Sequence, residues 1–333
     1  MVYADTRYQL QETLRFPLPG KNVTELQSQF LITNNLLEQV TIQQLADWHR
    51  LSYDYVRKQM SSLIPQEDQT DSFLVTLSAK TRNFQTGGSL PFVFANGELG
   101  RRYLKRNSIK IVSTQKVSKL FAKPHTLACN EFLIKGRLLT ERAPWLALAK
   151  FNHESELKAS PMYIPVTPRE TIGIAPDLWM DFHLFPRRRY CFCVEINLTP
   201  VTEKVWREKI RGYIHCVPVY KEKFGTDVIQ VPVIIGTRDH FPKRIYPNFS
   251  RQTLSIRRLQ ALERTARLKQ LIAWTQKELK EQNAKHMSDM FLFTDVALDT
   301  ITPQELFLYP YWLIPNSPAP VPLISRKEEY PHV

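Results

Sequence analysis

Two acidic residues, Asp177 and Glu195, lie at the ends of two apolar stretches in the segment APDLWMDFHLFPRRRYCFCVEIN (175–197). Asp177 follows a proline and precedes the stretch 178–185, and Glu195 lies near the end of the stretch 190–197. A carboxylate is costly to bury without a partner. The two acids therefore either point to solvent or converge on something that requires negative charge.

The elements around the two acids decide whether they can meet. Both apolar stretches are predicted strands, and the short turn between them holds a proline and three arginines. In an antiparallel hairpin the start of the first strand lies beside the end of the second, so Asp177 and Glu195 can stand side by side. Glu195 also shares one face of its strand with Cys191 and Cys193, because side chains alternate between the faces.

Two clustered carboxylates repel each other unless a cation neutralises them. Mg²⁺ suits such a site, because it takes one or two protein carboxylates and completes its shell with water and phosphate. The predicted helix that follows carries Lys209, one turn before Tyr213. If this helix packs over the sheet, Lys209 can orient a water or a phosphate oxygen. The alternative interpretation is two surface acids at strand ends and a solvated lysine.

The first third of the chain predicts a helix-turn-helix. Residues 24–40 have the apolar spacing of a helix, and Thr24 can cap it. Thr41 and Gln44 have capping-box spacing at the start of a short second helix, and Ser52 begins a third. In a helix-turn-helix this last helix enters the major groove. Its exposed positions hold the candidate DNA contacts Tyr53, Tyr55, Arg57 and Lys58.

A basic hairpin and a basic run follow. The strand-like runs 72–78 and 90–95 flank a loop with Lys80 and Arg82, which is typical of a wing whose tip reaches phosphate. Residues 101–124 hold eight lysines or arginines and no acid, which favours phosphate contact. The candidate contacts in this run are Arg101, Arg102, Lys105 and Arg106. The alternative is a three-helix module that contacts protein.

The whole chain of 333 residues is basic, with a formal net charge of +13, and 43% of it is hydrophobic. This favours a folded protein with a polyanionic partner, most simply double-stranded DNA, and an anionic membrane surface is the rival partner. No signal peptide is visible and no apolar run is long enough to span a bilayer, so we expect a soluble, cytoplasmic protein without a membrane partner. The four cysteines are predicted to be reduced and buried, with a zinc site at His215 and Cys216 as the less favoured alternative.

The order of these motifs resembles the replication-relaxation family of plasmid and mobile-element proteins. The resemblance covers nearly the whole chain, beginning with the helix-turn-helix and its wing. Its later parts are HTLACNEF (125–132), PD (176–177), VEIN (194–197), KIRGY (209–213) and a late strand ending toward PYWLIP (310–315).

The resemblance implies that the middle of the chain is similar to the PD-(D/E)xK nuclease fold. In that superfamily the PD acid and the acid of ExK hold metal, and the lysine helps the attacking water. Asp177 matches the first acid and Glu195 the second, whereas Asn197 stands where the lysine is expected. Lys209 could substitute from the neighbouring helix. An earlier helical acid, Glu154 or Glu156, completes the set, and Glu156 is taken as the candidate.

These inferences predict an α+β or α/β chain in which a winged helix-turn-helix precedes a restriction-endonuclease-like mixed α/β sheet domain. The later part of that domain is predicted to hold a strand at 228–237, a helix at 254–279 and a strand at 289–298. The predicted segments are an N-terminal extension (1–20), the winged helix (21–107), a basic connector (108–124), the nuclease-like domain (125–315) and a proline-rich tail (316–333).

The expected function is DNA binding for a plasmid or mobile element, in replication, relaxation or its transcriptional control. A relaxase or a replication initiator is the expected protein partner, and homodimerisation is left open. In this hypothesis the nuclease-like domain is a scaffold that has lost its metal. The alternative is a Mg²⁺-dependent endonuclease that nicks DNA with Asp177 and Glu195.

Overall fold

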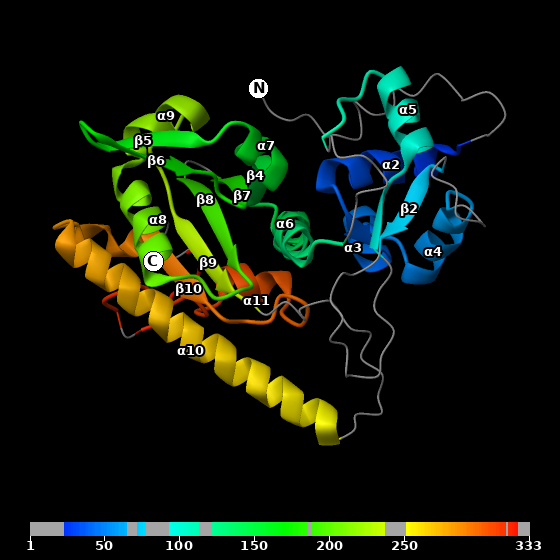
Figure 1. Cartoon of the computed structure of the whole chain (residues 1–333). Coiled ribbons are helices and arrows are strands. Elements are labelled where there is room, and N and C mark those ends of the chain that lie inside the picture. Colours follow the sequence, from blue (N-terminus) through cyan, green and yellow to red (C-terminus); the bar gives the residue numbers. More distant parts are fainter. Residues whose placement is uncertain are drawn as a thin grey trace. The chain divides into compact units, whose positions relative to one another are not determined.

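The computed structural model describes residues 23–64, 72–77, 93–112, 122–185, 188–236, 251–317 and 319–325, without the side chains of 251–261. The chain divides into two compact units, one reaching Ile134 and the other beginning at Lys135. The predicted domain boundary at residue 125 coincides with the start of helix α6 (Pro124–Arg142), whereas the division falls inside that helix. Figure 1 shows the chain with most of its elements labelled.

The first unit begins with helices whose caps could be read from the sequence. Thr24 and Thr41 each close a capping box with the glutamine three residues later, and the Ser52 hydroxyl accepts a hydrogen bond from a backbone N–H of the helix that it begins. The predicted helix starts are therefore confirmed. The elements are α2 (Glu25–Leu37), β1 (Val40–Thr41), α3 (Ile42–His49), α4 (Tyr53–Ser61), β2 (Leu74–Leu77), β3 (Val93–Asn96) and α5 (Glu98–Arg106).

The strands of the first unit form an antiparallel sheet in the order β1-β3-β2. Leu77 pairs with Val93, so the two runs predicted to form a hairpin do pair. The loop between them, with Lys80 and Arg82, lies outside the described residues. α5 begins directly after β3, and its Tyr103 and Leu104 are buried, so the start of the basic run is an amphipathic helix.

The second unit is a mixed α and β structure, as predicted. Its sheet has the order β10-β9-β8-β7-β4, antiparallel from β4 to β8 and parallel from β8 to β10. The elements are α6, β4 (Leu146–His153), α7 (Glu154–Ala159), β5 (Met162–Thr167), β6 (Glu170–Ile174), β7 (Leu178–Leu184), β8 (Arg188–Asn197), α8 (Glu203–His215), α9 (Val217–Phe224), β9 (Val231–Ile235), α10 (Arg251–Glu281), η2 (Lys285–Met290), β10 (Phe291–Thr294) and α11 (Pro303–Leu308).

Helices cover both faces of this sheet. On the face called the α8 face, Trp179, Cys193 and Val233 join one apolar cluster with residues of α8, α9, α10 and the β5–β6 hairpin. On the opposite face α6 approaches β7 closely at Gly136, where an added Cβ would lie 2.5 Å from the Met180 side chain. Figure 1 shows α8 and α10 beside each other along the sheet.

All four cysteines are free and buried, as predicted. Cys216 packs into the apolar cluster of the α8 face, and among the described residues it forms no ligand cluster with His215. Every helix that the structure describes is too short or too polar to cross a membrane.

The segment predicted as a separate proline-rich tail is, as far as residue 325, part of the second unit. Val321 bridges Trp312, and Leu323 and Ile324 are buried. Tyr190 donates a hydrogen bond from its hydroxyl to the backbone oxygen of Ser325, at 2.8 Å. The domain boundary predicted at residue 315 is therefore too early, because apolar side chains beyond it bury themselves against the sheet domain.

Candidate functional site

The β7–β8 hairpin brings Asp177 and Glu195 together. Leu178 pairs with Val194, and the Asp177 backbone N–H donates to the Val194 oxygen at 3.0 Å. The Asp177 carboxylate accepts a hydrogen bond from the Ile196 backbone N–H at 2.8 Å. Asp177 is 8% exposed and Glu195 is 3% exposed, so both acids are buried at the paired ends of β7 and β8 rather than solvated there. The predicted pairing geometry is confirmed.

Helix α8 supplies two partners for Glu195. Lys209 donates from its Nζ to Glu195 Oε2 at 2.5 Å, and Tyr213 donates from its hydroxyl to Oε1 at 2.5 Å. The two donors lie one helical turn apart and therefore share a face of the helix. Thr202 caps the helix, and the buried Ile210 holds it on the sheet. The structure thus brings Lys209 to the acid pair, and Tyr213 joins it.

The charges of this cluster act on one another. Burial raises the pKa of Glu195 to about 7, with the Lys209 ammonium opposing the shift and the Asp177 charge adding to it. Burial lowers the pKa of Lys209, but the fields of Glu195 and Asp177 outweigh it and leave that pKa raised. Lys209 is therefore an ammonium beside an acid that takes a proton near neutrality.

A third acid on this face has a different role. Asp181 is 1% exposed and receives two hydrogen bonds of 2.7 Å from the Arg189 guanidinium. Burial raises the pKa of Asp181, but the hydrogen bonds and charge of Arg189 outweigh it and leave the pKa lowered. The Cys191 thiol also donates to Asp181, at 3.4 Å, and His183 lies 3.3 Å away, so Asp181 has its own set of partners. Arg189 lies in β8 rather than in the predicted turn, because its register places it opposite His183.

The two candidate helical acids, Glu154 and Glu156, have different surroundings in the structure. Glu156 accepts hydrogen bonds from the His153 backbone N–H at 3.4 Å and from the Asn152 amide at 3.2 Å, so it caps its own helix, α7. The N3 position of a capping box turns the carboxylate back toward the helix start. Glu154, by contrast, contributes to the raised pKa of Lys209 and pairs with Lys158. The charge of Glu154 therefore acts on Lys209 of the acid pair.

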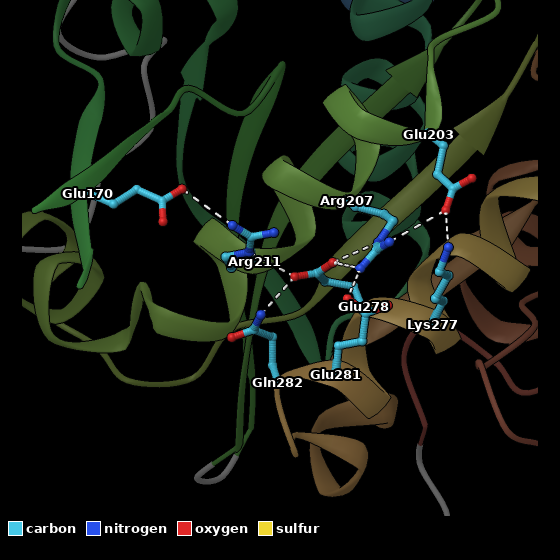
Figure 2. A network of polar contacts seen from close by, with 8 residues as sticks. All are labelled: Glu170, Glu203, Arg207, Arg211, Lys277, Glu278, Glu281 and Gln282. Carbon is cyan, nitrogen blue, oxygen red and sulfur yellow. Dashed lines mark hydrogen bonds and ion pairs between the residues drawn. The ribbon is translucent and has the colours of Figure 1, made fainter.

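Helix α10 holds α8 through a buried carboxylate (Figure 2). Glu278 is fully buried and accepts hydrogen bonds from the Nε atoms of Arg207, at 2.7 Å, and Arg211, at 2.8 Å. The two arginines lie one turn apart on α8, flanking the position of Lys209. Further contacts to this network come from Glu170, Glu203, Lys277, Glu281 and Gln282. The network therefore fixes the helix that carries Lys209.

In the first unit α4 presents most of its predicted DNA contacts to solvent. Tyr55 is 46% exposed, and Arg57 and Lys58 are also exposed, whereas Tyr53 is half-buried. Arg57 pairs at 3.8 Å with the exposed Asp54 one turn earlier, which leaves both side chains in solvent. The buried face of α4 consists of Val56 and Met60.

Helix α5 carries the other described group of predicted contacts. Arg102, Lys105 and Arg106 are exposed, and Arg101 is half-buried, with its pKa lowered by burial. Arg102 pairs with Glu98 at 3.5 Å. An open hollow of about 530 Å³ lies beside the helix, and its lining is mostly basic or polar. The lining residues are Glu98, Arg101, Lys105, Ser108, Ile109, Lys110 and Ile111.

Comparison of the chain with models of known protein families, with curated proteins and with solved structures found no match. The resemblance to the replication-relaxation family therefore stays a prediction that rests on the motifs.

Proposed function

We propose that the chain binds double-stranded DNA through its first unit, a winged helix, and that its second unit is a PD-(D/E)xK nuclease-like domain. The observation that carries this is the first unit's order: helix, short strand, helix, turn, helix and paired hairpin strands. Arg57 and Lys58 on α4 and the basic face of α5 supply phosphate contacts. In line with the resemblance, the DNA belongs to a plasmid or mobile element, and a relaxase or replication initiator is the protein partner.

The topology of the second unit supports the nuclease-like part. β4, β7 and β8 are neighbouring antiparallel strands, α8 follows β8, and β9 returns parallel to β8. Asp177 precedes β7 and Glu195 lies near the end of β8, which supports the match of Asp177 to the PD acid and of Glu195 to the ExK acid.

Metal-dependent phosphodiester cleavage is a second candidate function, favoured by the buried acid pair with its lysine. Asp177 and Glu195 are carboxylates of the kind that Mg²⁺ takes, and they would hold it. Bound Mg²⁺ would supply an activated water and neutralise charge on the phosphate. Lys209, held as an ammonium beside Glu195, would stabilise negative charge that develops on the phosphate. Tyr213 orients the Glu195 carboxylate.

DNA binding through α5 is tested by replacing Arg102, Lys105 and Arg106 together with glutamine. Each lost phosphate contact removes about one unit from the slope of log affinity against log salt, so we expect the slope to fall by about two to three units. Fluorescence anisotropy of a duplex oligonucleotide over a salt series measures it. The matched control replaces the exposed Lys269, Lys280 and Lys285 of the second unit with glutamine. An equal slope for wild type and the α5 variant contradicts the assignment.

Mg²⁺ binding is expected to strengthen as the pH rises to about 7 and to level off above it, because the metal ligand is the carboxylate and Glu195 holds a proton below its pKa of about 7. Isothermal titration calorimetry in a pH series measures the affinity. Below pH 7 the expected change is about tenfold per pH unit. Glu195→Gln should weaken Mg²⁺ binding at every pH and leave the remaining affinity independent of pH in this range. A wild-type affinity that stays constant from about pH 5.5 to about pH 8 contradicts the prediction.

The same pKa shift has a consequence for stability without metal. A carboxyl whose folded pKa is raised favours the folded state below its unfolded pKa of about 4.3. That contribution is lost as the pH rises from there through the folded pKa of about 7.

A further inference from the structure

Helix α10 places a buried guanidinium at the ends of two strands. Arg267 is 7% exposed and donates from Nη1 to the Gly236 oxygen at 2.9 Å and from Nη2 to the Asn197 oxygen at 2.8 Å. These two carbonyls lie at the ends of β9 and β8. Among the described residues the ion-pair partner of Arg267 is Glu263, at 3.9 Å, and that side chain is 56% exposed. The positive charge of the buried guanidinium is therefore only weakly neutralised by this exposed carboxylate.

Arg267 also fixes the side chain of Asn197. Its Nη2 donates to Asn197 Oδ1 as well as to the backbone oxygen. A guanidinium has donors only, so the atom that it contacts must be the carbonyl oxygen of the amide. The amide nitrogen is turned away from Arg267, and in the described part of the chain it has no hydrogen-bond partner.

The position of Asn197 makes this nitrogen chemically useful. Asn197 lies two residues after Glu195 on β8, so both side chains stand on the α8 face, about 7 Å apart along the strand. The residue between them, Ile196, donates a hydrogen bond from its backbone N–H to the Asp177 carboxylate. The amide therefore offers two N–H donors beside a pair of carboxylates that would otherwise repel an anion.

We propose that Asn197 donates a hydrogen bond from its amide nitrogen to a non-bridging oxygen of a DNA phosphate held at Asp177 and Glu195. Arg267 is the positioning residue that fixes the amide in the donating orientation. This rests on the proposed function, because it needs a phosphodiester at the acid pair.

The charges explain why a neutral donor fits here. A lysine at residue 197 would place an ammonium against the buried Arg267 guanidinium, and like charges in a buried site repel strongly. An amide accepts from Arg267 through its oxygen and donates to phosphate through its nitrogen. It therefore supplies the donor without a second cation.

The first test is Asn197→Asp, which keeps the size and the acceptor for Arg267 but removes the N–H donors. The measurement is the ratio of duplex affinities with Mg²⁺ and with EDTA, by anisotropy, with the duplex checked to be intact afterwards. We expect this ratio of duplex affinities to fall by about tenfold or more, because a hydrogen bond to a charged phosphate oxygen is lost. Mg²⁺ affinity by calorimetry and the melting temperature should not fall. Gln270→Glu, an exposed change of equal charge on α10, is the control.

The second test separates positioning from a merely structural role of Arg267. Arg267→Lys keeps the charge but loses the fork that orients the amide, and we expect it to weaken the Mg²⁺-dependent gain by about tenfold. In an Asn197→Ala background the same change should cost nothing further, whereas a structural role would cost the same in both backgrounds.

The outcomes are distinct. If Asn197→Asp keeps the full wild-type gain in duplex affinity from Mg²⁺, the proposal is overturned and the proposed metal site is unaffected. An equal effect of Arg267→Lys in the wild-type and Asn197→Ala backgrounds has the same meaning. A wild type that gains no DNA affinity from Mg²⁺ overturns the proposed metal site and this inference together.

Discussion

The double variant Asp177→Asn, Glu195→Gln is expected to leave supercoiled plasmid intact where the wild type nicks it with Mg²⁺ or Mn²⁺. Both substitutions keep the size of the side chains and remove the negative charges that would hold the cation. A metal ion contributes several kcal/mol to transition-state stabilisation, so the expected loss of rate is on the order of a thousandfold or more. Conversion of supercoiled to open-circular plasmid on agarose gels measures it.

The control for this prediction makes the same chemical changes elsewhere in the second unit. Asp289 and Glu222 are exposed, so Asp289→Asn, Glu222→Gln should nick at the wild-type rate. DNA binding in EDTA should be the same for all three proteins, because the first unit is unchanged. If the wild type and both variants shift DNA but none cleaves it, the cleavage hypothesis is wrong. The protein is then a DNA-binding module with a degenerate nuclease-like domain.

The acid pair could be predicted from the sequence because a hairpin is a local structure. Once the two apolar stretches are taken as antiparallel strands with a short turn, the register follows, and Asp177 must lie near Glu195. Lys209 could be predicted for a similar reason, since a helix directly after β8 packs back on the sheet. Glu156 closes a capping box whose spacing could also be read from the sequence, so its carboxylate has a local partner at the start of α7.

Arg267 and Glu278 could not be found from local patterns. Both belong to α10, whose contacts with Asn197 and Arg207 join residues about 70 positions apart, as the hydrogen bonds record. In the sequence α10 reads as a long amphipathic helix with a basic face, and nothing in its period marks which charges become buried. A cue was present in the unusual asparagine at residue 197, because a polar residue near the end of a buried strand needs a partner.

Among the helices and strands, too, the elements with local sequence signals were predicted and those that depend on distant contacts were not. Capped helices and the β-branched strand β9 were predicted, since their signals are local. α5 was hidden because a run of basic residues looks like a solvated stretch until Tyr103 and Leu104 are seen as its buried face. β4 and the β5–β6 hairpin were not predicted, because their burial depends on the sheet and on α8.

Glu278→Ala is expected to destabilise the second unit by about 3–5 kcal/mol, the usual result of removing one partner from a buried ion pair. Glu278 is fully buried, and its loss leaves the Arg207 and Arg211 guanidiniums without the carboxylate that both contact. Urea unfolding followed by tryptophan fluorescence measures the change. Trp206 is a suitable reporter, because its ring N–H donates to Thr275 on the same helix as Glu278, at 3.0 Å.

The exposed Glu281 provides the matched comparison, since it also pairs with Arg207 but is 49% exposed. Glu281→Ala should cost about 1 kcal/mol or less, as exposed ion pairs do. Equal costs for the two alanine variants would show that burial of Glu278 does not decide the strength of the network.

The pH dependence of stability gives a second, independent readout of Glu278. Burial would raise the pKa of its carboxyl, but hydrogen bonds from Arg211 and Arg207 outweigh burial and leave the pKa lowered. A carboxyl with a lowered folded pKa stabilises the fold above its unfolded pKa of about 4.3 and loses that contribution as the pH falls through the folded value. The difference in unfolding free energy between wild type and Glu278→Gln should therefore be full at neutral pH and shrink in acid. Since α8 carries Lys209, acid that releases Glu278 should also loosen the helix that holds Lys209 on Glu195.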